Sequence, residues 1–212
     1  MNRHKFYRSL TSVSVALAFA LCVLGYSHLA NAAASDEIQR LAELMDWKPG
    51  TAVADIGAGD GRYAFSAVKF VGPDGKVFAT EIDTEKLAAL RSEVKSRHLQ
   101  NVIVEESKEA DTNLPKECCD AIFLRRVYHH LIKPAEFDAA LVRSLKPGGR
   151  LAIIDFAARS GLPPVEGVPA NRGGHGIPQK IVVEELTAAG LQLSKTVDDW
   201  PEGDYCLLFV KK

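Results

Sequence analysis

The feature of this chain that most constrains its fold is a set of three glycines at alternate positions, placed directly after a short apolar run. The run covers residues 53–56, and the glycines are Gly57, Gly59 and Gly61. A backbone that leaves a buried strand, turns sharply and enters a helix favours residues without a Cβ at the turn. Such a turn presents main-chain N–H groups at the start of the helix to a ligand. The stretch therefore predicts a ligand-binding loop between a strand and a helix.

Two phosphate-binding motifs do not match this glycine spacing. A P-loop ends in Gly-Lys followed by Ser or Thr, and the loop lacks that ending. A dinucleotide fingerprint, G-x-G-x-x-G, needs its third glycine at position 62, where the chain has Arg62. The spacing therefore disfavours both kinds of nucleotide site.

Strand and helix patterns alternate over almost all of residues 51–212. Apolar runs predict strands at residues 51–56, 77–81, 101–105, 120–124, 150–156, 191–197 and 205–210. Helical periodicity predicts helices from the glycine loop to about residue 70 and at 84–98, 134–145 and 178–189, with a further amphipathic helix starting at residue 35. This alternation predicts an α/β fold with a parallel, doubly wound sheet. Residues 157–178 are rich in Gly and Pro, and we expect them to form a lid.

Four segments together resemble the class I S-adenosylmethionine (SAM)-dependent methyltransferases. They are the loop with Asp55 two residues before its first glycine, the strand that ends in Glu81, the run Tyr128-His129-His130, and Lys-Pro-Gly-Gly before the fifth strand. The resemblance implies a Rossmann-like, doubly wound sheet of seven strands, mostly parallel with an antiparallel last strand. It also implies SAM as the cofactor.

The resemblance places the cofactor at the carboxyl ends of the first strands. The loop and the helix N-terminus would take the carboxylate of the SAM amino-acid arm, and Asp55 would favour its ammonium. Glu81 would accept hydrogen bonds from the ribose hydroxyls. Ser107, Lys108 and Glu109 are the candidates for the adenine contact. The expected cofactor-binding set is Asp55, Gly57, Ala58, Gly59, Gly61, Tyr63, Glu81, Ile82, Ser107 and Arg125.

Candidates for a general base follow the fourth strand and lie in the expected lid. Tyr128, His129 and His130 should reach the carboxyl edge of the sheet, and His175 stands among the lid glycines. Imidazole suits proton transfer near neutral pH. Each residue also has a structural interpretation, with Tyr128 as a packed aromatic and the histidines as helix caps or hydrogen-bonded groups.

These residues predict transfer of the SAM methyl group to a small-molecule acceptor. Two alternatives stay open at this point. A nicotinamide (NAD)-dependent oxidoreductase would also use a glycine turn and a strand-end acid, and a SAM-binding protein without catalysis would share the whole motif set.

Charge and cysteine content exclude some other partners. The formal net charge of −1 argues against a nucleic-acid surface. Cys118 and Cys119 are adjacent, a poor spacing for zinc ligands, so we expect no metal site and interpret both as small residues at a strand edge, with a redox role as the alternative. Cys206 should lie at the opposite end of the sheet from them, too far for a disulfide.

The first 34 residues predict a cleavable signal peptide. Arg3, Lys5 and Arg8 precede an apolar stretch at about residues 13–24, and small residues favour cleavage near Ala32 to Ala34. The catalytic domain would then cover residues 35–212, exported to the periplasm. Contact with a membrane is expected only through this segment, if it remains uncleaved.

Overall fold

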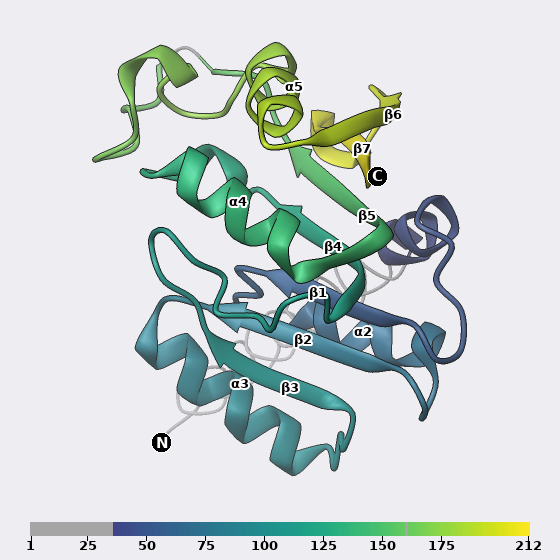
Figure 1. Ribbon diagram of the computed structural model, residues 1–212. Coiled ribbons are helices and arrows are strands. Elements are labelled where there is room, and N and C mark those ends of the chain that lie inside the picture. Colours follow the sequence, from purple (N-terminus) through teal and green to yellow (C-terminus); the bar gives the residue numbers. More distant parts are fainter. Residues whose placement is uncertain (1–35, 160) are drawn as a thin grey trace, which may run out of the picture.

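The computed structural model describes residues 36–159 and 161–212, and these form a twisted seven-stranded sheet with helices on both faces (Figure 1). The predicted signal peptide at 1–34 lies outside the described residues. The strands are β1 (Ala52–Ile56), β2 (Lys76–Glu81), β3 (Val102–Glu106), β4 (Cys119–Arg125), β5 (Leu145–Asp155), β6 (Leu191–Val197) and β7 (Tyr205–Lys211). The helices are α2 (Arg62–Val71), α3 (Thr84–Ser96), α4 (Pro134–Ser144) and α5 (Gln179–Ala188), with short 3₁₀ turns η1 (Tyr128–His130), η2 (Ala170–Arg172) and η3 (Pro201–Gly203).

The sheet topology confirms the predicted fold class. The strand order is β3-β2-β1-β4-β5-β7-β6, and β7 runs antiparallel to both of its neighbours while the other pairings are parallel. The chain moves outward from β1 to β3 and then returns to place β4 on the other side of β1. Open α/β sheets bind ligands at the carboxyl ends of the strands at such a reversal. The site is therefore expected above β1 and β4.

Alternate residues of each central strand enter two separate cores. In β4, Phe123 packs with α2 and with the helix at residues 36–44, whereas Ile122 and Leu124 pack with α4 and α5. This follows from the two-residue period of a strand, which points successive side chains to opposite faces. Strands buried on both faces explain why the sequence shows continuous apolar runs.

Two local features differ in detail from the predicted boundaries. Asp83 caps α3 and accepts hydrogen bonds from the amides of Glu85 and Lys86, and the helix ends at Ser96 rather than near residue 98. β5 begins at Leu145, earlier than predicted, because Leu145 pairs with Cys119 before the ladder shifts register and resumes with Arg150 opposite Ala121. The Lys-Pro-Gly-Gly sequence at residues 146–149, which the prediction placed before the strand, is therefore an irregularity within it.

The expected lid is anchored at one buried residue. Residues 157–178 contain only the short turn η2 among their described positions. Arg172 of η2 is 2% exposed, and its guanidinium donates to the Glu185 carboxylate and to the carbonyl oxygens of Leu131 and Tyr128. The arginine thus ties this segment to α5 and to η1, beside the end of β4.

Two further properties concern the described residues as a whole. Cys118, Cys119 and Cys206 are free thiols. Cys206 pairs with Ile154 near the carboxyl end of β5, whereas Cys119 starts β4, so the predicted separation is confirmed. Within residues 36–159 and 161–212, no helix is both long and apolar enough to cross a bilayer.

The packing of α4 gives a test of the core. Leu141 is fully buried between α4 and the sheet, so Leu141→Ala leaves a cavity and should lower the free energy of unfolding by about 2–5 kcal/mol. Leu162→Ala is the matched control, because Leu162 is 45% exposed and its loss should change stability by less than about 0.5 kcal/mol. Urea unfolding measures both, and equal effects would contradict this packing.

Candidate functional site

A cavity of about 520 Å³ opens at the carboxyl ends of β1, β2 and β4, where the topology places a ligand. Its size falls within the range of small-molecule and cofactor sites. The wall combines loop glycines, charged groups and an apolar side. It is formed by Ile56, Gly57, Gly59, Glu81, Ile82, Lys86, Ser107, Lys108, Glu109, Arg125, Arg126, Val127, His130, Leu131, Ile132 and Phe137.

The glycine loop needs glycine for two separate reasons. Gly57 has φ +72° and lies against the turn after β4, where a Cβ would meet Val127 Cγ2 at 2.6 Å. Gly61 has φ +77° at the N-terminus of α2, where a Cβ would lie 2.4 Å from Phe65 Cε2 and 2.6 Å from Leu90 Cδ2. A side chain at either position would be strained and would also collide with a neighbouring element.

Glu81 joins the end of β2 to the glycine loop. Its Oε2 accepts a hydrogen bond from the Gly59 amide at 2.9 Å, and its Oε1 accepts from the amides of Ile82 and Asp83 at 2.8 and 3.1 Å. An ionised carboxylate offers about four acceptor positions. These three bonds therefore orient the carboxylate in the cavity wall and leave acceptor capacity for a hydroxyl donor.

Asp55 is a buried carboxyl group beneath the loop. It is 3% exposed, and its Oδ2 has no hydrogen-bond partner among the described residues. Burial raises the pKa of Asp55 to about 8, against the lowering effect of the Ala64 amide, and the charges of Asp60 and Glu81 add to the rise. An orphaned acid in this position fits a ligand that brings a positive charge to the loop.

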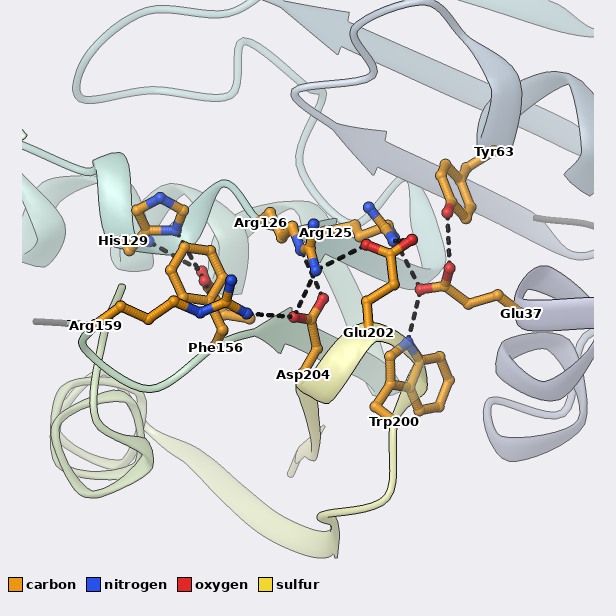
Figure 2. A network of polar contacts seen from close by, with 11 residues as sticks. Glu37, Tyr63, Arg125, Arg126, His129, Phe156, Arg159, Trp200, Glu202 and Asp204 are labelled. Carbon is orange, nitrogen blue, oxygen red and sulfur yellow. Dashed lines mark hydrogen bonds and ion pairs between the residues drawn. The ribbon is translucent and has the colours of Figure 1, made fainter. Parts of the chain in front are cut away.

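Arg125 is a cation that the N-terminal helix holds at the cavity wall (Figure 2). Its Nε donates to Glu37 Oε1 at 2.8 Å, and its guanidinium lies 5.0 Å from the centre of the Tyr63 ring. Glu37 also accepts hydrogen bonds from Tyr63 Oη at 2.7 Å and from Trp200 Nε1 at 2.6 Å. Burial alone would raise the pKa of Glu37, but the bonds from Arg125, Trp200 and Tyr63 together lower it.

Arg126 extends this network toward the C-terminal strands (Figure 2). It forms a two-point ion pair with the buried carboxylate of Asp204, at 2.7 and 2.8 Å, and a further ion pair with Glu202 at 2.8 Å. Both Arg126 and Glu202 have positive φ, 54° and 63°, which is uncommon for residues other than glycine. Backbone strain of this kind collects at functional sites.

Three imidazoles meet at the ends of β4 and β5. His129 is 3% exposed, and its Nδ1 lies 2.8 Å from Asp155 Oδ1, so it donates to that carboxylate. Its ring centre lies 4.0 Å from that of His130 and 5.5 Å from that of His175. His130 alone of the three lines the cavity, and partial burial together with the neighbouring His129 lowers its pKa.

Tyr128 does not lie at the cavity. It is fully buried, its hydroxyl donates to Asp138 Oδ2 at 2.9 Å, and Arg172 covers its ring at 5.1 Å. Burial, with the nearby Asp138, raises the pKa of Tyr128 far above its usual range. The Tyr128 side chain is therefore a packed aromatic of the core, which is the structural alternative given above for this residue. It is not available to a substrate in the cavity.

The predicted residues divide between the cavity wall and its support. The predicted cofactor-binding residues that line the cavity are Gly57, Gly59, Glu81, Ile82, Ser107 and Arg125. Those that lie behind the wall are Asp55, Ala58, Gly61 and Tyr63. Of the expected bases, His129 and His175 contact His130 from behind or from the lid rather than facing the cavity. Lys108 and Glu109, the other adenine candidates, also line it.

Several wall residues were not predicted. Lys86 lies in the first turn of α3, and Ile132 and Phe137 flank the start of α4. Arg126 and Leu131 lie close to the predicted run Tyr128-His129-His130 on either side, and that run was the available signal for them. Among residues 36–159 and 161–212, no group of three or more His, Cys, Asp and Glu side chains can hold a metal ion.

The buried state of Asp55 predicts a pH-dependent stability. Because the folded carboxyl binds its proton more tightly than the unfolded chain does, stability should fall as pH rises from about 4 to 8, by up to about 1.4 kcal/mol per pH unit. Asp55→Asn should remove this slope. Urea unfolding of the ligand-free protein at several pH values measures it, with Asp74→Asn in an exposed turn as the control. Parallel pH curves for the wild type and Asp55→Asn would contradict the burial of this charge.

Comparison with known proteins gives one family. A family model described as "Methyltransferase domain" matches residues 54–153, from β1 into β5. A SAM-dependent methyltransferase structure from Aquifex aeolicus is 29% identical, with a TM-score of 0.70 over 83% of this chain and 90% of that one. The structure of a geranyl diphosphate methyltransferase in complex with SAM, 15% identical with a TM-score of 0.66 over 84% of this chain and 85% of that one, shares the fold.

Curated relatives match the same part of the chain. Nocamycin O-methyltransferase of Saccharothrix syringae is 30% identical over 115 residues, which are 54% of this chain and 41% of that protein. The ubiquinone/menaquinone biosynthesis C-methyltransferase of Pseudomonas putida is 30% identical over 118 residues, 54% of this chain and 45% of that protein. The chain thus spans less than half the length of these relatives. Residues 54–153 thus match a methyltransferase domain, and the described residues share the fold of SAM-dependent methyltransferases.

Proposed function

We propose that this chain transfers the methyl group of SAM to a small-molecule acceptor. The observation that carries the proposal is the cavity at the glycine loop, with the oriented Glu81 carboxylate in its wall. SAM supplies a methyl carbon already activated by a positively charged sulfur. The protein therefore has to bind, align the acceptor and exclude water.

The cavity offers a group for each part of the cofactor. Glu81 has the acceptor capacity for a ribose hydroxyl. Ile82 is 53% exposed and gives an apolar face for the adenine ring. Arg125 is a wall cation for the amino-acid carboxylate, and the orphaned Asp55 beneath the loop favours the adjacent ammonium.

His130 is the residue best placed to take a proton from an acceptor. It lines the cavity, and its lowered pKa keeps the imidazole neutral at pH 7. His129 stacks on it and is itself fixed by Asp155, so the orientation of His130 is constrained from behind. A neutral, oriented imidazole is suited to general-base catalysis.

A small acceptor is supported by the curated relatives and by the lid. By their names, curated relatives include methyltransferases for nocamycin, arsenite and 2-phytyl-1,4-beta-naphthoquinone. The segment at 157–178, anchored by Arg172, brings His175 next to His130. No described residue of this segment lines the cavity, and we propose that the segment closes over a bound acceptor and excludes water.

We also propose that the protein is exported. The support is the basic start of the chain, the apolar stretch that follows it and the small residues near position 32. Fractionation of cells that express the full chain, with N-terminal sequencing of the product, tests this. A cytoplasmic product that retains residues 1–34 would contradict it.

Binding of the cofactor product is the first test of the function. Calorimetric titration should show saturable binding of S-adenosylhomocysteine and none of NAD⁺. Glu81→Ala should raise the Kd about 10- to 100-fold, because charge-assisted hydrogen bonds are lost. Glu106→Ala is the matched control, since Glu106 lies opposite Glu81 on β3 but is exposed. NAD⁺ binding in place of S-adenosylhomocysteine would favour the oxidoreductase alternative.

Catalysis is tested separately with isotopically labelled SAM and a panel of phenols, quinols and arsenite. With an acceptor that becomes labelled, His130→Ala should lower kcat about 10²- to 10⁴-fold and remove the loss of activity at acid pH, where the wild-type imidazole is protonated. His98→Asn, an exposed histidine at the end of α3, is the control. Unchanged turnover in His130→Ala would remove the proposed base, and binding without turnover of any acceptor would favour a non-catalytic SAM-binding protein.

A further inference from the structure

Two adjacent cysteines at the amino end of β4 bring their sulfur atoms together. Cys118 Sγ and Cys119 Sγ are 3.1 Å apart, close enough for an S–H···S hydrogen bond. Cys118 is partly exposed, whereas Cys119 is fully buried where β4 begins. Cys118 is therefore the more accessible residue of the pair.

The surroundings favour the thiolate on the Cys118 sulfur. The hydrogen bond from Cys119 lowers the pKa of Cys118, partly opposed by burial and supported by the positive charges of Lys146 and Arg143. The same bond, together with burial, raises the pKa of Cys119 well above its usual range. Lys146 and Arg143 are themselves paired, with Asp120 and Asp111. The Cys119 thiol thus remains a hydrogen-bond donor to Cys118.

We propose that Cys118 and Cys119 form a reversible oxidation site, in which Cys118 is the attacking thiol and Cys119 the resolving thiol. Reactive cysteines of this kind are partly exposed, lie near cations and stand next to a second cysteine. The oxidant is a small disulfide, RSSR, of the glutathione class. This site is separate from methyl transfer and does not depend on the proposed function.

The reaction proceeds in two exchange steps. The Cys118 thiolate attacks one sulfur of RSSR, the S–S bond of RSSR breaks, and the products are a mixed disulfide on Cys118 and RS⁻. Cys119 then loses its proton to solvent and attacks Cys118 Sγ, which releases the second RS⁻ and forms the bond between the two cysteines. Overall, two protein thiols are oxidised by two electrons, and RSSR is reduced to two RSH.

The bond formed in this way should be easy to reduce. Adjacent Cα atoms are about 3.8 Å apart, less than the span of about 4.4–6.8 Å that unstrained disulfides occupy. Strained disulfides are the labile ones. The ladder beside the pair is already irregular, because the register of β4 against β5 shifts between Cys119 and Ala121. The backbone of β4 can therefore adjust its conformation at the cysteines without breaking a regular hydrogen-bond ladder.

The pair lies at the opposite edge of the sheet from the cavity. Cys119 pairs with Leu145 at the start of β5, whereas Arg125, at the other end of β4, lines the cavity. The chemistry at the cysteines can therefore be measured directly, without reference to cofactor binding or turnover.

Native protein incubated with glutathione disulfide, acid-quenched and alkylated should give a peptide that contains Cys118 and Cys119, has lost two hydrogens and carries no glutathione. Cys119→Ser should stop at a glutathione adduct on Cys118, and Cys119→Ala repeats this test with a second side chain. Cys118→Ser should slow modification of Cys119 by tenfold or more. Cys206→Ala is the control and should behave as the wild type, because Cys206 is fully buried. Dithiothreitol should restore both thiols.

Two results would overturn the proposal. One is a stable glutathione adduct on Cys118 of the wild type, which would mean that Cys119 does not resolve it. The other is the finding that, after incubation with glutathione disulfide, both thiols of the native wild type can still be alkylated, whereas those of the urea-unfolded chain are oxidised. Thermal unfolding of each variant shows that the comparison is made between folded proteins.

Discussion

The hydrogen bonds that Glu81 accepts from the Gly59 amide of the glycine loop and from the amides of Ile82 and Asp83 hold this site together. One carboxylate at the end of β2 binds Gly59 of the loop after β1 and also the amides that lead into α3. The bonds can form only because β1 and β2 are parallel neighbours whose carboxyl ends coincide, with Ile56 opposite Thr80. The parallel pairing of β1 with β4 brings Gly57 close to Val127 in the turn after β4. The cavity therefore follows from the sheet topology together with one acidic side chain.

A second constraint is the balance of buried charge around Arg125 and Arg126. Glu37 comes from the helix at 36–44 and Asp204 from the start of β7, so the two arginines connect opposite ends of the chain at the cavity wall. Removing one partner of such a pair leaves an uncompensated charge, which costs more than the intact pair contributes. The intact ion pairs therefore hold the two arginines in fixed positions in the cavity wall, although neither arginine belongs to the glycine motif.

The sequence was sufficient for the fold and for the cavity residues that sit at strand ends. Apolar runs located the strands, and Gly57, Gly59 and Glu81 were found because each lies at or shortly after the end of a strand. The sequence was not sufficient for the run after β4. There η1 turns Tyr128, His129 and His130 in different directions, so neighbours in sequence reach the core, the Asp155 carboxylate and the cavity. Ion pairs such as that of Arg125 with Glu37 join residues far apart in the chain and leave no local pattern.

The arrangement of the histidines shows how a packed core can serve a reactive group. Asp155 is fully buried and accepts hydrogen bonds from the His129 ring, the His129 amide and the Phe156 amide, so its negative charge is held by three donors. His129 is fixed in turn and presents its ring to His130. Partial desolvation and the adjacent His129 imidazole both disfavour a positive charge on His130 and so lower its pKa. Among the described residues, His130 is the only histidine that lines the cavity. Its position at the end of η1, next to the buried His129, thus favours the neutral state that a base requires.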